Sequence, residues 1–492
     1  MKINTLLSHA AELFSLVSNS ELPADHISSR YFRSKKYIGS GDRKFLSGLL
    51  FYTLRNLIFI EHLAECLPTT ISADYQKSDY GPSDVRKVTA SYLLGSISED
   101  SSFDPDSLLK RFYKQLDSFD ELRVQTLSEI FGIGSSEAEE LPIEIAKSVD
   151  IIDNQLIDAE DNEESFTDDR FLSLIERRYS LPVLLAEKLY NNQYFSFSRS
   201  EFKSLAASTS LPAEIFIRCN SRRDSRENIQ RNLLKQGIET TIADFSPVAL
   251  SLKRRTPLNQ VVLYKKGLIE PQDEGSQIVS FALSPAPKTT VLDACAGAGG
   301  KTLHIASLQN DSGTVYACDT ENIRLKEIPV RSKRFKYKSI SSVLLTEGKL
   351  DQLATDKTGL FSSGFDYILI DAPCSGTGTI RRSPMQKFKI DEKALKEFAG
   401  LQFEILEKYS QFLKPGGVIV YATCSLMSEE NDAVVEQFIE DHAEFAPDPL
   451  KPVFAQHNIS FPELGDNDFK LRLLPSVHGC DGFFMARLKK LI

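Results

Sequence analysis

The C-terminal half of the chain alternates short apolar runs with helix-like stretches, and this alternation constrains the fold more than any other feature. Strand-like runs, each followed by a helical stretch, are expected at residues 290–294, 313–319, 341–345, 365–371 and 418–422. Strands and helices that alternate at this spacing build a doubly wound, largely parallel sheet, so an α/β fold is predicted from residue 271 onward. Ligands of such sheets bind at the carboxyl ends of the strands.

The first of these strands runs into a glycine-rich turn, VLDACAGAGGKTLHIA, at residues 291–306. Glycines let the backbone approach a ligand closely, although the turn fits neither the GxGxxG pattern nor a P-loop. Asp319 ends the second strand, where an acid accepts two hydrogen bonds from a ribose diol. Together these features predict an adenosine-containing ligand. Glu347, after the third strand, either meets the adenine or is ordinary surface.

Two cysteines follow the carboxyl ends of later strands, Cys374 in DAPCSGTGTI and Cys424 in YATCSLMSEEN. Buried free cysteines are usually small hydrophobes, but small and turn residues flank these two and keep their sulfur atoms reachable. A catalytic thiol needs a helix amino terminus or a cation nearby to gain thiolate character, and Ser428 is expected to cap a helix just beyond Cys424. The pair therefore predicts a nucleophile and a helper rather than a protease or a zinc site.

Composition narrows the range of partners. The seven cysteines form no CxxC pair and no cluster with histidine, which indicates free thiols in a reducing cytoplasm and no structural metal. No uncharged apolar stretch is long enough to span a membrane, and the first residues lack a convincing cleavage site, so neither a membrane nor export is expected.

The net charge of −10 is unevenly distributed along the chain. Residues 135–169 hold thirteen acids against one lysine, whereas residues 216–266 hold eleven Lys/Arg against four acids. A further seven basic residues against one acid lie at 324–338. These runs permit a basic groove for nucleic acid in spite of the acidic total.

Four regions are predicted from these patterns: a helical region at 1–135, an acidic linker or loosely packed segment at 136–170, a small α+β module at 171–270, and the α/β domain at 271–492. Within the first region, apolar residues recur at helical spacing on one stripe, at positions 46, 49, 50, 53, 54 and 57.

The motifs DACAGAGGKT, DAPCSGTGTIRRSP and YATCSLMSEEN together resemble the Sun/RsmB family of S-adenosylmethionine-dependent RNA 5-methylcytosine methyltransferases. Residues 267–280 look like the opening of the family's catalytic domain, and residues 479–490 look like its closing strand. Residues 38–56 are similar to its N-terminal helical domain, which is related to NusB. The resemblance implies a Rossmann-like class I methyltransferase domain, an N-terminal all-α NusB-like RNA-binding domain and a small α+β RNA-binding module.

The resemblance also implies roles for particular residues. Cys424 is the nucleophile that adds to carbon 6 of cytosine, and Cys374 is associated with release of the product. Asp371 lines the site between cofactor and cytosine and, protonated or bridged by water, stabilises charge at ring nitrogen 3. Arg381 and Arg382 are expected to contact RNA. The cofactor S-adenosylmethionine is expected to be held by Cys295, Ala296, Gly297, Ala298, Gly299, Gly300, Lys301, Asp319, Glu347 and Asp371.

The expected activity is methylation of carbon 5 of a cytosine in 16S ribosomal RNA by a monomeric, metal-free cytoplasmic enzyme, through a covalent cysteine–cytosine intermediate. The same reaction on transfer RNA is one alternative. A non-catalytic RNA-binding factor of ribosome assembly is another, although the presence of both cysteines and the cofactor acids argues against it. The chain departs from the family pattern in two places: the glycine turn lacks a stiffening proline, and Glu347 stands where aspartate is usual.

Overall fold

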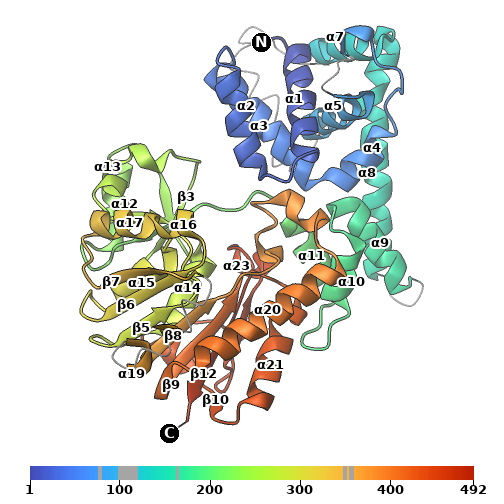
Figure 1. Ribbon diagram of the computed structural model, residues 1–492. Coiled ribbons are helices and arrows are strands. Elements are labelled where there is room, and N and C mark those ends of the chain that lie inside the picture. The colour runs from blue at the N-terminus through green and yellow to red at the C-terminus, as the bar shows by residue number, and fades with distance from the viewer. Residues whose placement is uncertain (76–79, 98–119, 162–165, 347–351, 354–359, 492) are drawn as a thin grey trace. The chain divides into compact units, whose positions relative to one another are not determined.

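The computed structural model describes residues 1–75, 80–97, 120–161, 166–346, 352–353 and 360–491, which form two compact units (Figure 1). The helical unit comprises residues 1–212 and 380–389, and the sheet unit comprises residues 213–379 and 390–492. The chain thus crosses from the sheet unit into the helical unit and back again within the segment that follows the Cys374 motif.

Amphipathic helices build the helical unit, and their apolar faces form its core. In α3 the predicted stripe is buried from position 46 to position 54, with Leu46, Leu49 and Leu54 fully enclosed, whereas Leu57 begins α4 and is half-buried. The described helices are α1 (Ile3–Ser18), α2 (Ala24–Ser34), α3 (Ser40–Arg55), α4 (Leu57–Ala64), α5 (Pro82–Ile97), α7 (Asp120–Phe131), α8 (Ser135–Asp161), α9 (Asp168–Tyr179), α10 (Val183–Tyr190) and α11 (Arg199–Thr209), with short 3₁₀ turns η1 (Ala73–Tyr75) and η4 (Pro384–Phe388).

The acidic stretch predicted as a linker is instead a 27-residue helix, α8, so that prediction is wrong for residues 135–161. Ala138, Leu141, Ile145, Ile152 and Leu156 recur at helical spacing and are buried. The many acids of this stretch made its composition look like that of a linker, although its apolar residues recur at helical spacing. An acidic helix is stable when one apolar stripe packs against neighbouring elements. Contacts with α5, α7 and α9 supply that packing.

A small antiparallel sheet opens the sheet unit, with strand order β2-β3-β1-β4. Its α+β character matches the predicted module, but the module begins near residue 213, because α9 to α11 belong to the helical unit. Its elements are β1 (Phe216–Cys219), α12 (Arg226–Leu234), β2 (Thr240–Ile242), β3 (Ala249–Leu252), η2 (Leu258–Gln260), α13 (Val262–Lys265) and β4 (Ile269–Pro271).

The main sheet has the predicted Rossmann-like architecture, with strand order β10-β12-β9-β8-β5-β6-β7 and β11 paired to β12. Neighbours from β7 across to β9 are parallel, and β12 is antiparallel to β9. Its strands are β5 (Thr290–Asp293), β6 (Thr314–Asp319), β7 (Ile340–Leu344), β8 (Phe365–Asp371), β9 (Leu413–Thr423), β10 (Phe445–Pro447), β11 (Lys470–Leu473) and β12 (Phe483–Lys490). The five strands predicted from apolar runs are all present.

Helices and short turns connect these strands. They are α14 (Glu274–Leu283), α15 (Gly300–Leu308), α16 (Asn322–Leu325), α17 (Glu327–Phe335), α19 (Leu360–Ser363), η3 (Thr377–Thr379), α20 (Glu392–Ser410), η5 (Ser428–Glu430), α21 (Asp432–Asp441), α22 (Leu450–Ala455) and α23 (Pro475–His478). The chain runs from β5 out to β7 and then returns to β8 on the other side of β5. This reversal of strand order leaves room for a ligand at the carboxyl ends of the central strands.

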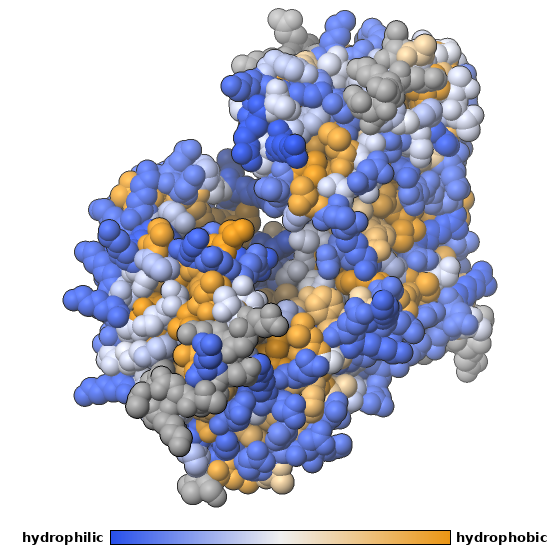
Figure 2. All heavy atoms as spheres, in the orientation of Figure 1, coloured by the Kyte–Doolittle hydropathy of each residue, from blue (hydrophilic) through white to orange (hydrophobic). Residues whose placement is uncertain are grey.

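The face drawn in Figure 2 is largely hydrophilic, as expected for a chain with 26% charged residues. In the part of the chain that the structure describes, no helix combines the length and apolar character needed to cross a membrane.

Candidate active site

A cavity of about 1100 Å³ lies at the carboxyl ends of β5, β6, β8 and β9, where the strand order reverses. Most of the residues predicted for the site line it: Cys295, Ala296, Gly297, Ala298, Gly300, Lys301, Asp319, Asp371, Cys374 and Cys424. Gly299 belongs to the same turn but does not line the cavity, and Glu347 lies outside the described residues. The fold thus gathers side chains from four strand ends into one pocket.

The two cysteines of the cavity are direct neighbours. The Sγ atoms of Cys374 and Cys424 lie 3.3 Å apart, and both side chains are partly exposed. The hydrogen bond with Cys424, burial and the nearby Glu430 carboxylate together raise the pKa of Cys374 well above its ordinary value. The raised pKa keeps Cys374 in its thiol form, and in the contact between the two sulfur atoms either one can be the donor.

Backbone and hydroxyl contacts interlock the loops that carry these cysteines. The Gly378 N–H donates to the Cys424 carbonyl over 2.9 Å, and a Cβ at Gly378 would lie 2.1 Å from the Gly482 carbonyl oxygen. The Thr377 Oγ1 accepts from the Leu426 N–H over 2.8 Å. The small residues after Cys374 are needed because a larger side chain would separate the two loops.

The predicted helix cap beyond Cys424 is wrong. Ser428 opens a 3₁₀ turn, η5, and α21 begins only at Asp432 with Asn431 before it. The residue before α21 is Asn431, and its side chain makes no cap hydrogen bond to the helix; its Oδ1 accepts from the Thr423 hydroxyl instead. A helix terminus at Ser428 is therefore not the feature that activates the thiol.

An ion pair joins two of the predicted residues across the cavity. The Lys301 Nζ lies 2.7 Å from the Asp371 Oδ2, and Lys301 also lies over the Phe483 ring at 5.2 Å. Lys301 comes from the first turn of α15, and Asp371 is the last residue of β8. The lysine expected to wrap the cofactor thus contacts the acid expected beside the cytosine.

The glycine turn between β5 and α15 is held by side chains from outside it. Gly297 and Gly299 have φ angles of +53° and +83°, which side-chain-bearing residues rarely adopt. The Gly297 N–H donates to the Asp319 Oδ2 over 2.7 Å, and the Arg331 guanidinium donates to the Ala298 carbonyl over 2.6 Å. A Cβ at Gly299 would lie 2.7 Å from Ile328. These contacts do the stiffening that a proline would otherwise do.

Asp293, at the end of β5, is a fully buried acid that lines the same cavity. Its Oδ2 accepts from the Thr302 hydroxyl over 2.6 Å, and its Oδ1 has no hydrogen-bond partner among the described residues. Burial raises the pKa of Asp293 to about 7. S-adenosylmethionine carries a sulfonium and an ammonium group, so a glycine turn beside the acids Asp293, Asp319 and Asp371 fits this cationic cofactor.

Several lining residues were missed by the sequence reasoning. Helix α20 contributes Phe398, Leu401, Glu404, Ile405, Lys408 and Tyr409, and α14 contributes Ser276. The residues of α20 lie in no motif, and their part in the cavity depends on how α20 packs beside β8 and β9; Ser276 lies in the family-like stretch 267–280, but no role was predicted for it. The helical period of α20 was the one available signal, and it identifies a packed face but not a ligand.

The two arginines predicted to contact RNA differ in exposure. Arg381 is 5% exposed, and its backbone carbonyl accepts from the Arg55 Nε over 3.2 Å within the helical unit, while its RNA contact stays a prediction. Arg382 is exposed and stays a predicted contact. Lys387, also fully buried, donates to the Arg55 carbonyl over 2.7 Å, and burial lowers its pKa to about 7. This segment anchors itself in the helical unit.

Among the residues that the structure describes, no group of three or more His, Cys, Asp or Glu side chains is arranged to hold a metal ion.

Comparison with known proteins gives consistent matches. The family model of the 16S rRNA methyltransferase RsmB/F matches residues 280–489. A Synechocystis protein described as a probable ribosomal RNA small subunit methyltransferase B is 32% identical over 68% of this chain and 71% of its own length. The 25S rRNA (cytosine-C(5))-methyltransferase nop2 of Schizosaccharomyces pombe is 29% identical over 66% of this chain and 53% of its own length.

The chain therefore spans between about half and about 70% of the lengths of these relatives. Among solved structures, the crystal structure of PH0851 aligns with 99% of both chains at a TM-score of 0.68 and 22% identity, which shows a shared fold.

Proposed function

This chain belongs to the RsmB/F family of 16S rRNA methyltransferases, whose cofactor is S-adenosylmethionine, and we propose that it methylates carbon 5 of a cytosine in 16S ribosomal RNA. The observation that carries the proposal is the pair of thiols 3.3 Å apart at the edge of the cofactor cavity. An amino-group methyltransferase has no use for two thiols, whereas carbon 5 of cytosine needs a nucleophile to activate it. The name of the fission-yeast relative, a cytosine-C(5)-methyltransferase, also supports carbon 5 as the methylated atom.

Cys424 is the proposed nucleophile. Carbon 5 of cytosine is a poor nucleophile until a thiolate adds to carbon 6, because the addition turns the ring into an enamine. Cys424 directly follows β9 and opens onto the cavity, and the Cys374 thiol stabilises negative charge on its sulfur by donating a hydrogen bond. S-adenosylmethionine, when bound, supplies the methyl group that carbon 5 accepts.

Cys374 is the proposed base for product release. After methyl transfer, carbon 5 must lose its proton before the bond between carbon 6 and the Cys424 sulfur breaks by elimination. Once Cys424 is bonded to carbon 6, it is no longer a strong acceptor, so the largest cause of the raised pKa of Cys374 is removed. The second thiol can thus give up its proton after the first has reacted. A water held by Cys374 serves the same purpose.

Asp371 and Lys301 are proposed to orient the base of the substrate. Asp371 ends β8 beside the Cys374 loop, and its carboxylate either reaches ring nitrogen 3 through water or accepts from the amino group of cytosine. Lys301 balances the charge on Asp371 at 2.7 Å. The cytosine must leave its stack to reach this cavity, at a cost of a few kcal/mol, which is lowest in a loop or single strand.

RNA binding is supported by exposed basic residues of the sheet unit. In the small module these are Arg222, Arg231, Lys235, Lys253, Arg254, Arg255, Lys265 and Lys266. Further exposed lysines occupy α17 and the turn after it, at 333, 336 and 338. Such residues neutralise phosphates without reading sequence, so they suit a cytoplasmic RNA substrate selected by shape. Arg382 adds a further cation in the helical unit.

The proposal is tested by following both cysteine variants with 16S rRNA and S-adenosylmethionine on denaturing gels. Cys424→Ala is expected to abolish methyl transfer, because no other thiol adds to carbon 6. Cys374→Ala is expected to accumulate a covalent protein–RNA adduct, because the intermediate forms but cannot eliminate. Cys66→Ala, in the helical unit, is the matched control and should behave like the unaltered enzyme.

An adduct trapped by Cys424→Ala would reverse the roles of the two cysteines. Methylation of transfer RNA in place of 16S rRNA would show that transfer RNA is the substrate. If the unaltered protein methylates neither RNA, the alternative of a non-catalytic RNA-binding factor would be favoured.

A further inference from the structure

We propose that Glu430 is a positioning residue that clamps the Cys374 and Cys424 loops together and, through its negative charge, keeps Cys374 protonated while Cys424 acts as the nucleophile. This inference rests on the proposed function and deepens it. Glu430 lies on η5, does not line the cofactor cavity, and is fully buried. Its role is therefore to act through the two thiols and not on the substrate.

The Glu430 carboxylate bonds to both cysteine loops at once. Its Oε1 accepts from the Ser375 N–H over 2.7 Å and from the Gln402 side chain over 3.0 Å. Its Oε2 accepts from the hydroxyls of Ser375 and Ser425. Ser375 directly follows Cys374, and Ser425 directly follows Cys424, so one carboxylate fixes the residue next to each thiol.

The two partners of Oε1, the Ser375 N–H and the Gln402 amide nitrogen, can only donate, and the two serine hydroxyls are placed to donate to Oε2. The geometry therefore indicates an ionised carboxylate. Its described partners are two hydroxyls, one backbone N–H and one amide, and none of them is a cation. A buried charge compensated only by neutral donors keeps a strong field at short range.

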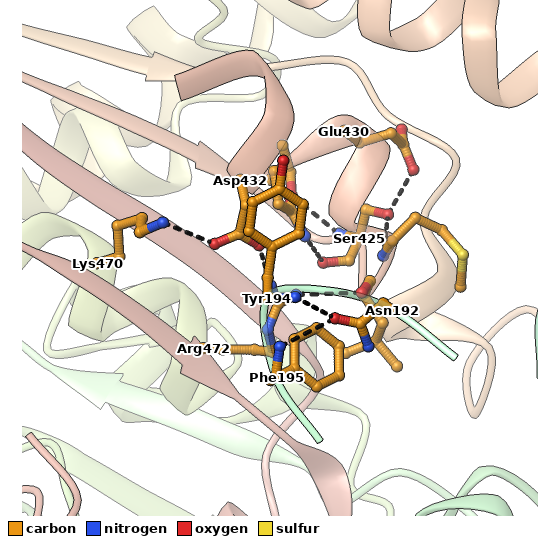
Figure 3. Close-up of polar contacts among 12 residues, drawn as sticks. Asn192, Tyr194, Phe195, Ser425, Glu430, Asp432, Lys470 and Arg472 are labelled. Carbon is orange, nitrogen blue, oxygen red and sulfur yellow. Dashed lines mark hydrogen bonds and ion pairs between the residues drawn. The ribbon is translucent and has the colours of Figure 1, made fainter. Parts of the chain in front are cut away.

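The turn that carries Glu430 is itself held in place. The Tyr421 hydroxyl donates to the Glu430 carbonyl, and the Asn431 amide donates to the Ser425 carbonyl over 2.9 Å. On the other side, the Arg472 guanidinium donates to the Leu426 carbonyl and pairs with Asp432, to which Lys470 also binds (Figure 3). Figure 3 shows Glu430 directed toward Ser425 while Asp432 is directed toward the two cations. Glu430 thus binds the two cysteine loops, whereas Asp432 binds the cations Lys470 and Arg472.

The charge of Glu430 bears on Cys374. Titratable groups near this thiol are Tyr421 on β9, Cys424 directly after β9 and Glu430 on η5. Asp371 and its partner Lys301 line the same cavity. The hydrogen bond to Cys424 is the largest cause that raises the pKa of Cys374, followed by burial and the charges of Cys424 and Glu430. A fixed negative charge beside Cys374 therefore favours its neutral thiol form over its thiolate.

The first experiment measures alkylation of the free enzyme by iodoacetamide between about pH 6 and pH 10, with Cys374 read by peptide mass spectrometry. In Glu430→Gln, loss of the negative charge should lower the pKa of Cys374 and speed its alkylation at pH 8 by about three- to tenfold, which corresponds to a shift of about half to one pH unit. Asp432→Asn removes the neighbouring buried acid and is the matched control, because Asp432 contacts neither Ser375 nor Ser425. Its Cys374 profile should match that of the unaltered protein.

The second experiment measures the clamp. Diamide joins two adjacent thiols into a disulfide and takes up their two hydrogen atoms, so the rate of Cys374–Cys424 disulfide formation reports how well the sulfur atoms are held together. Glu430→Asp keeps the charge but is one methylene shorter, and Ser375→Ala keeps the charge but removes a donor. Both should form the disulfide several-fold more slowly while the alkylation profile of Cys374 stays near that of the unaltered protein.

An unchanged Cys374 profile in folded Glu430→Gln, or an equal shift in Asp432→Asn, would overturn the electrostatic role. Unchanged disulfide rates in Glu430→Asp and Ser375→Ala would overturn the clamp. If Glu430→Gln does not fold, Glu430→Asp and Ser375→Ala still decide the clamp. Glu430→Asp keeps the charge, so a shift of its Cys374 alkylation profile by the half to one pH unit expected for loss of charge would contradict the electrostatic role. These readouts need no RNA, so they fail independently of the adduct experiment.

Discussion

At the scale of single residues, the cavity combines acids whose environments differ. Asp319 uses both carboxylate oxygens to accept backbone N–H groups, from Gly297 and from Glu321. Asp371 is paired with Lys301. Asp293 has one hydroxyl donor and an oxygen without a described partner. Acids of the same type at neighbouring strand ends thus have distinct tasks, because the partners of each differ.

The buried Asp293 leads to a prediction about pH. Its pKa is about 7 in the folded protein and about 3.9 in an unfolded chain, so the folded state binds the extra proton between these values. Stability from this group is therefore fully present below about pH 4 and is lost as pH rises through 7. Asp293→Asn should reduce this loss, by on the order of a few kcal/mol, and melt higher than the unaltered protein at pH 8.

Thermal unfolding followed by circular dichroism from pH 4 to pH 8 checks this expectation, with exposed Asp441→Asn as control. A pH dependence in Asp293→Asn equal to that of the unaltered protein would contradict the buried, neutral-preferring carboxyl.

At the scale of elements, α17 supports the cofactor turn from outside. Arg331 on α17 donates to the Ala298 carbonyl and pairs with Glu270, a fully buried acid of β4 that also binds Arg334. Arg218, fully buried on β1, donates to the Gly300 carbonyl over 2.8 Å. The small antiparallel sheet thus stiffens a turn that lacks a proline.

This support predicts that Arg331→Met weakens S-adenosylmethionine binding about three- to tenfold, because the Ala298 carbonyl loses its donor and the turn samples other conformations. Lys333→Met, an exposed position on the same helix, is the matched control and should leave affinity unchanged. Titration calorimetry with the cofactor measures both. Equal affinities in the two variants would show that the turn holds its shape without Arg331.

At the scale of the whole molecule, residue contacts cluster within two units. The chain leaves the sheet unit for one short segment of the helical unit and then returns to the sheet unit. Residues 380–389 follow the Cys374 motif and belong to the helical unit, where Lys387 donates to the Arg55 carbonyl and Lys389 pairs with Glu21. The part of the sequence motif that follows Cys374 is therefore a structural element of the helical unit.

Two units with separate cores should unfold in two calorimetric transitions. S-adenosylmethionine at 100 times its dissociation constant should stabilise the sheet unit alone, by about 2.7 kcal/mol, because the cavity belongs to that unit. Leu46→Ala, in the core of α3, should destabilise the other transition by about 2–5 kcal/mol. Scanning calorimetry tests both; a single transition that both changes shift equally would mean that the units unfold as one.

Local signals in the sequence determined the five central strands, the family and the cysteines at two strand ends. Apolar runs and glycine-rich turns depend on neighbouring residues, so they are readable from one stretch of chain. The helix α8 was misread because its acids outnumber its apolar stripe in composition. The part of Arg381 as an anchor had no local signal, since it follows from packing with Arg55.

The tertiary structure alone decided how the site is held together. Glu430 bonds to Ser375, 55 residues away, and Arg331 bonds to Ala298, 33 residues away. Neither contact leaves a pattern in the sequence around either partner, because hydrogen bonds between distant residues depend on where strands and helices meet. The sequence by itself determined which groups are candidates for the chemistry, because they lie in local motifs, and the packing of distant elements decided the distances and contacts between them.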